Sequence, residues 1–69
     1  MEKGWVIAYK TRLDYQAEIF KEVLHDHGIA AQIINKLDST YKSFGDIEVY
    51  VPDTQILKAK MLASKFEQG

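Results

Sequence analysis

Two histidines, His25 and His27, are the side chains whose type most directly suggests metal binding. Histidines that hold a metal ion from one helix are usually four residues apart, because that spacing puts both rings on one face. A spacing of two turns the rings about 200° apart around the helix axis. The sequence therefore predicts no metal site. We interpret both rings as polar groups at a helix C-terminus, where the helix dipole favours a protonated imidazole.

The segment between residues 36 and 45 is the second place where chemistry is conceivable. It combines cationic and aromatic side chains, Lys36, Tyr41, Lys42 and Phe44. Cations beside aromatic rings can bind an anionic small molecule, so these four residues are a candidate ligand or partner site. The alternative, which the small size of the chain favours, is that the aromatic rings fold back over the end of a sheet.

No catalytic pattern is recognisable in the sequence. Ser39, Ser43 and Ser64 lack the glycine-rich turn that exposes a nucleophilic serine. Asp46 and Glu48 share one face of a predicted strand, but Glu48 alternates with apolar residues and is expected to face solvent. The chain has no cysteine, which excludes disulfides, thiolate nucleophiles and cysteine-ligated zinc. We expect a protein that is not an enzyme and needs no cofactor.

Length and composition indicate one small globular domain, residues 1–69. Hydrophobic residues make up 46% of the chain and charged residues 28%, which is ordinary for a folded protein. Basic and acidic residues are interspersed and leave a formal net charge of −1, which argues against a nucleic-acid binder. No apolar run is long enough for a membrane span, and the N-terminus lacks the apolar core of a signal peptide. The expected location is the cytoplasm.

Hydrophobic periodicity predicts strands at about residues 4–10, 29–36 and 46–51 and helices at about 13–27 and 53–67. The order β-α-β-β-α is that of a ferredoxin-like fold without its fourth strand. We expect an α+β two-layer sandwich in which two helices cover one face of a three-stranded mixed sheet, with the first two strands parallel. Because the fourth strand is missing, the first strand would have a free edge.

Both predicted helices carry an apolar stripe. Thr11 and Asp14 fit a capping box at the start of the first helix, and Gly28 is expected to end it in a Schellman motif closed by Ile29. Asp53 is expected to cap the second helix. The first stripe consists of Leu13, Ala17, Phe20, Val23 and Leu24. The second consists of Ile56, Ala59, Leu62, Ala63 and Phe66, with Leu57 and Met61 widening it at one margin.

The predicted first strand is apolar on both faces. Alternation places Trp5, Ile7 and Tyr9 on one face, and Val6 and Ala8 on the other. One face must cover the helices, and the other is free to pack against a partner. Trp5, Val6 and Ala8 are therefore candidate interface residues, with burial of Trp5 under a helix as the alternative.

The chain resembles a known group of small prokaryotic proteins. The resemblance is carried by Trp5, Val6, Ala17, Leu24, Gly28, Ile29, Ala31, Asn35, Val49, Val51 and Asp53. These residues are similar to those of a small prokaryotic domain of unknown function described as a signal-transducing protein. That family is classed with the nitrogen-regulatory PII (GlnB-like) fold. The resemblance implies a GlnB-like fold and a regulatory role, and it names no activity.

Residues 47–56, I-E-V-Y-V-P-D-T-Q-I, are also similar to a strand-and-helix junction of PII proteins. In PII the loop before this junction is the signalling loop, which carries a modifiable tyrosine; it corresponds here to residues 37–45, with Tyr41. The glycine-rich phosphate-binding segment of PII has no counterpart in this sequence. The resemblance therefore does not imply binding of nucleotide or 2-oxoglutarate.

Two functions remain open from these residues. The first is a non-enzymatic signal-transduction or interaction module that docks a protein partner, or a second copy as a homodimer, on the free first-strand edge. The second is a small-metabolite sensor in which the loop 36–45 closes on an anionic ligand, with Lys36 and Lys42 as the cations. The missing strand and the apolar alternate face favour the first function.

Overall fold

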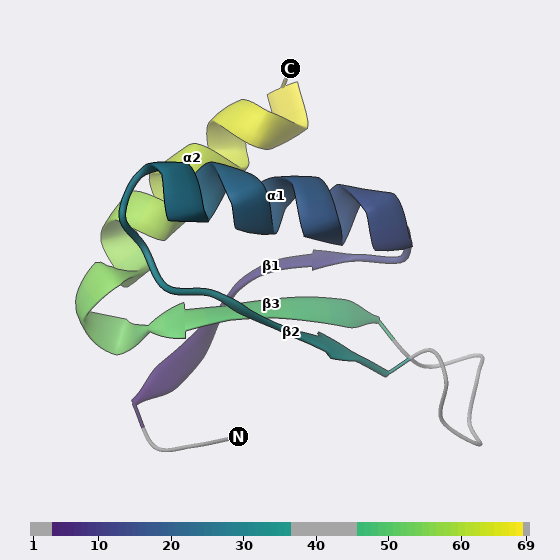
Figure 1. The fold of residues 1–69 in the computed structure, drawn as a ribbon, viewed down its shortest axis with the longest axis horizontal. Helices are drawn as coiled ribbons and strands as arrows, with labels where there is room; N and C mark the ends of the chain where they lie inside the picture. Colours follow the sequence, from purple (N-terminus) through teal and green to yellow (C-terminus); the bar gives the residue numbers. More distant parts are fainter. Residues whose placement is uncertain (1–3, 37–45, 69) are drawn as a thin grey trace.

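A computed structural model describes residues 4–36 and 46–68 of the chain. The predicted order of strands and helices is confirmed (Figure 1). The candidate ligand residues Tyr41, Lys42 and Phe44 lie outside the described residues. The elements are β1 (Trp5–Thr11), α1 (Asp14–Asp26), β2 (Gln32–Asn35), β3 (Ile47–Pro52), the single 3₁₀ turn η2 (Asp53–Gln55) and α2 (Ile56–Gln68).

The three strands form one open sheet in the order β1-β3-β2, with both helices on the same face (Figure 1). β3 runs antiparallel to both of its neighbours. The expectation of a mixed sheet is therefore wrong: β1 and β2 point the same way, but β3 lies between them and takes the hydrogen bonds of both. The predicted edge position of β1 is confirmed, because β1 lies at one end of the sheet order.

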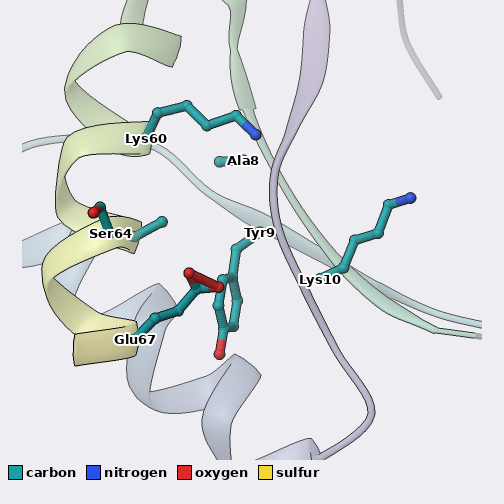
Figure 2. Close-up of a pocket in the computed structure, with 7 residues that line it drawn as sticks. Ala8, Tyr9, Lys10, Lys60, Ser64 and Glu67 are labelled. Atoms are coloured by element: carbon teal, nitrogen blue, oxygen red, sulfur yellow. The ribbon is translucent and has the colours of Figure 1, made fainter. Parts of the chain in front are cut away.

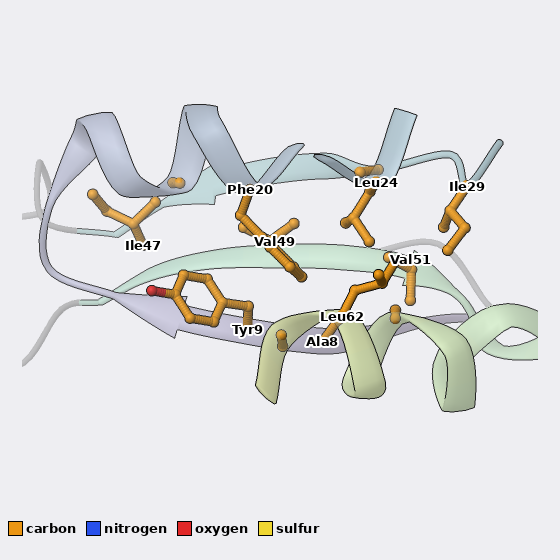
Figure 3. Close-up of a cluster of buried hydrophobic side chains, with 13 residues drawn as sticks. Ala8, Tyr9, Phe20, Leu24, Ile29, Ile47, Val49, Val51 and Leu62 are labelled. Atoms are coloured by element: carbon orange, nitrogen blue, oxygen red, sulfur yellow. The ribbon is translucent and has the colours of Figure 1, made fainter. Parts of the chain in front are cut away.

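The core lies between the helices and the sheet (Figure 3). The rings of Tyr9 and Phe20 in this core contact each other and the ring of the partly buried Phe66. The ring centroids of Tyr9 and Phe20 are 4.9 Å apart, and Phe66 lies 5.4 Å from Phe20 and 5.7 Å from Tyr9. Such tilted and edge-to-face pairs add about 0.5–1.5 kcal/mol each beyond their buried area. The largest fully buried side chains are Phe20, Leu24, Ile29, Ile47, Val49 and Val51.

A β-bulge in β1 changes which side chains face the helices. Ile7 pairs with Tyr50 and Tyr9 pairs with Val49, so Ala8 is an extra residue on the β1 side of the ladder. Ala8 and Tyr9 are consequently both buried in the core, and Val6 packs against it. The predicted strict alternation is wrong at Tyr9, which lies on the helix side rather than beside Ile7.

The ends of α1 agree only in part with the predictions made from the sequence. The Schellman motif is confirmed: the N–H of Ile29 donates to the carbonyl of Leu24 at 2.9 Å, and Gly28 adopts a φ of 76°. The capping box is wrong, because the hydroxyl of Thr11 accepts from the N–H of Leu13 and no side chain caps the helix. Leu13 stands at the helix start, 46% exposed, and does not join the buried stripe.

The second helix buries the predicted residues but not the two at their margin. Ala59, Leu62 and Ala63 are buried, and Ile56 and Phe66 pack against the core. Leu57 is 85% exposed and Met61 is 52% exposed, since both point away from the sheet. Asp53 makes no side-chain cap; its backbone N–H instead donates to the carbonyl of Gly4 at 2.7 Å. The 3₁₀ turn η2 therefore precedes the regular helix.

Candidate functional site

The outer edge of β1 is the feature of the described residues with the clearest capacity for recognition. β1 has seven residues and, among residues 4–36 and 46–68, it is paired on one side only, with β3. The peptide groups along its other side are available to an added strand. The opposite edge, on β2, has only four residues, which is a common way to keep a sheet edge from pairing. The sheet therefore offers one long edge.

A groove of about 280 Å³ runs between β1 and α2 beside this edge (Figure 2). Two small buried side chains, Ala8 from β1 and Ala63 from α2, leave the space that larger residues would fill. The side chain of Lys60 extends from α2 across to β1 in Figure 2, whereas Lys10 extends on the other side of that strand. The residues lining the groove are Ala8, Tyr9, Lys10, Lys60, Ala63, Ser64 and Glu67.

The residues that line the groove include two lysines and one glutamate, all exposed, although the ammonium group of Lys10 lies on the other side of β1. The side chains of Lys10 and Lys60 form no ion pair or hydrogen bond with any described residue. Lys10 lies opposite Glu48 in the strand register, but that carboxylate bonds to other groups. Two cations beside the strand edge are therefore available to an acidic partner.

Of the three residues predicted to form an interface, only Trp5 lies on an uncovered surface. Ala8 is 2% exposed and Val6 packs against the core, so neither can be replaced by a charged residue without disturbing the fold. Trp5 pairs with Pro52 and alternates with Val6, which places it on the sheet face opposite the helices, where it is half-buried. The alternative of a tryptophan under a helix is wrong.

The helix-free face of the sheet holds a polar cluster among half-buried apolar residues. Glu48 is only 8% exposed, which corrects the expectation that it faces solvent. It accepts a hydrogen bond of 2.9 Å from the hydroxyl of Tyr50, and Lys36 Nζ lies 3.2 Å from its Oε1. The bond to Glu48, with some desolvation and the carboxylate charge, raises the pKa of Tyr50; Lys36 acts in the opposite direction.

Of the predicted ligand loop, residues 36–45, only Lys36 is among the described residues. Its ammonium group pairs with Glu48 on the sheet face, so its charge is already partly compensated. No group of three or more histidine, aspartate or glutamate side chains in residues 4–36 and 46–68 could hold a metal ion. His27 Nδ1 lies 2.9 Å from the carbonyl of Val23 in its own helix. This contact fits the structural role assigned to the histidine from the sequence.

The sequence analysis missed the α2 half of the groove, Lys60, Ser64 and Glu67. Their spacing of four and three residues shows that they share one side of the helix. That spacing alone could not distinguish a groove wall from an ordinary solvated face, because the outcome depends on where β1 lies beneath α2.

Comparison with known proteins found no match: no family model, curated protein or solved structure is similar to this chain. Within the described part of the chain, no helix has the length and apolar character needed to cross a membrane.

Proposed function

We propose that this chain is a non-enzymatic interaction module of a signal-transduction system that accepts an extended segment onto the free edge of β1. The observation that carries the proposal is the juxtaposition of an unpaired seven-residue strand edge and the groove beneath α2. An added strand would gain hydrogen bonds from the peptide groups of β1, while one of its side chains would enter the groove. Main-chain bonds supply affinity in this mode, and the groove supplies specificity.

The family resemblance belongs to the same proposal. A small prokaryotic signal-transducing domain with a GlnB-like, ferredoxin-like fold would have the element order found here, with the position of the missing fourth strand beside β1. A cytoplasmic location is part of the same proposal. The groove then lies where the fold would otherwise place its own strand, which is the physical reason for expecting a strand from another chain.

The experiment is an unbiased selection of peptides from a randomised displayed library on the immobilised protein, followed by amide NMR mapping with a selected peptide. We expect chemical-shift changes along β1 and on the turns of α2 that contain Lys60 and Ser64. Failure to select any peptide, or shifts confined to β2 or to the helix-free face, would overturn the proposal.

The second candidate function, an anionic-metabolite sensor built on residues 36–45, has Lys36 as its only described residue. Because Lys36 pairs with Glu48, a ligand at this point would have to compete with an existing carboxylate. Titration with ATP, ADP and 2-oxoglutarate tests it. Binding that disappears in a Lys36→Ala, Lys42→Ala double variant would establish the sensor in place of the docking module.

A further inference from the structure

We infer that the segment accepted by β1 is an acidic, apolar strand of a different protein and not a second copy of this chain. The inference rests on the proposed docking at the β1 edge and specifies its partner. Its basis is the combination of a small recess beside the buried residues Ala8 and Ala63 with two lysine side chains that no described carboxylate engages.

The recess suits one side chain of an added strand rather than a free small molecule. Its volume of about 280 Å³ lies at the lower limit of the roughly 300–1,000 Å³ typical of pockets for drug-sized ligands. Ala8 and Ala63 leave the space, and the Tyr9 ring is part of the lining. An aliphatic or aromatic side chain, held by backbone pairing to β1, would cover these apolar groups.

We call the side chain that enters the recess the anchor. The charges on the two sides of β1 specify which residues of the added strand should flank it. Lys60 lies on the helix side of the strand and Lys10 on the opposite side (Figure 2). In an added strand successive side chains point to opposite faces. An acid next to the anchor therefore faces Lys10, and an acid two positions from the anchor faces Lys60. The lining residues include two lysines and one glutamate, Glu67, so together they carry one more positive charge than negative charge.

A second copy fits this surface poorly. The sequence from Gly4 to Leu13 contains no aspartate or glutamate, so a partner β1 would offer no carboxylate to either lysine. It would instead add a second Lys10 to the same edge, which increases the positive charge there. The bulge at Ala8 also interrupts a regular ladder, which is a known protection of edge strands against self-association.

The test uses the composition of the selected peptides. We expect an apolar residue with aspartate or glutamate enriched one and two positions away from it. Lys60→Glu should weaken binding of such a peptide roughly tenfold, as expected for replacing an attraction by a repulsion at an exposed site. The matched control is Lys58→Glu, which reverses an exposed lysine of the same helix that does not line the groove.

The outcomes separate this inference from the docking proposal itself. Peptides that map to β1 but show no acidic enrichment, or that bind Lys60→Glu and Lys58→Glu equally, would overturn the inference and leave edge docking intact. A dimer whose amide shifts on dilution map to β1 would overturn it as well, since the second copy would then be the partner. If a Lys10→Glu, Lys60→Glu double variant selects lysine-containing peptides instead, the charge argument is established.

Discussion

The hydroxyl of Tyr50 donates a 2.9 Å hydrogen bond to Glu48 Oε1 on the face of the sheet that no helix covers. Glu48 and Tyr50 are two residues apart on β3 and therefore point the same way. Lys36 from the end of β2 reaches the same carboxylate. A nearly buried carboxylate on an open sheet face is thus satisfied by two neighbours, which explains how a polar residue is tolerated between core positions.

This arrangement predicts that replacing Glu48 and replacing Lys36 change the pKa of Tyr50 in opposite directions. Glu48→Gln should lower the pKa of Tyr50 toward its usual value, because the carboxylate that favours the protonated phenol is removed. Lys36→Gln should raise it further, because the cation that favours phenolate is lost. NMR pH titration of the tyrosine ring carbon measures both. A shift of the same sign in the two variants would contradict the arrangement.

The same pKa shift has a consequence for stability. Because the folded pKa lies above the unfolded one, folding favours the protonated phenol. The Tyr50 contribution to stability should be complete below the unfolded pKa of about 10 and be lost as pH rises through the folded value. Urea denaturation at several alkaline pH values should show a steeper loss in the wild type than in Tyr50→Phe. If stability falls equally with pH in the wild type and in Tyr50→Phe, the hydrogen bond from Tyr50 to Glu48 does not couple folding to the protonation of Tyr50.

The bulge at Ala8 predicts that Ala8 and Lys10, two positions apart on β1, respond very differently to a change of charge. Ala8→Asp should destabilise the fold by about 3 kcal/mol or more, because it buries a carboxylate without a partner in a position that is 2% exposed. Lys10→Gln, at an exposed position two residues later, should change the free energy of unfolding by about 0.5 kcal/mol or less. Urea denaturation provides the comparison. Equal effects would mean that the strand faces are assigned wrongly.

The left-handed conformation of Gly28 predicts a moderate and purely local cost for an added side chain. Gly28→Ala should cost about 1 kcal/mol, since φ is 76° and a Cβ there would touch nothing within 4 Å. Gly28→Asn should cost less, because asparagine tolerates this conformation better. A loss of several kcal/mol for alanine would indicate a steric clash that the structure does not contain.

Much of this architecture is readable from the sequence because it depends on local pattern. The Schellman end of α1 needs only Leu24, Gly28 and Ile29 in the right spacing, and the structure forms it. The buried stripe of α2 and the order of elements follow from periodicity in the same way. The edge position of β1 is expected from that order, because a ferredoxin-like arrangement without its fourth strand leaves the first strand unpaired on one side.

The features that the sequence did not predict depend on contacts between distant segments. The bulge at Ala8 exists only in the register of β1 against β3, so alternation along β1 could not reveal it. Leu57 and Met61 are apolar residues on the outer side of α2, and composition alone gave no reason to separate them from the core. The low exposure of Glu48 likewise requires Lys36 and Tyr50 to lie beside it.

Amide hydrogen exchange of the protein with and without a selected peptide tests the central claim most directly. Pairing of an added strand protects backbone N–H groups, whereas docking of side chains alone does not. We predict increased protection of amides within β1, with β2 at the opposite edge of the same sheet as the unchanged internal control. Unchanged exchange along β1 in the presence of bound peptide, or protection that appears on β2 instead, would contradict the account.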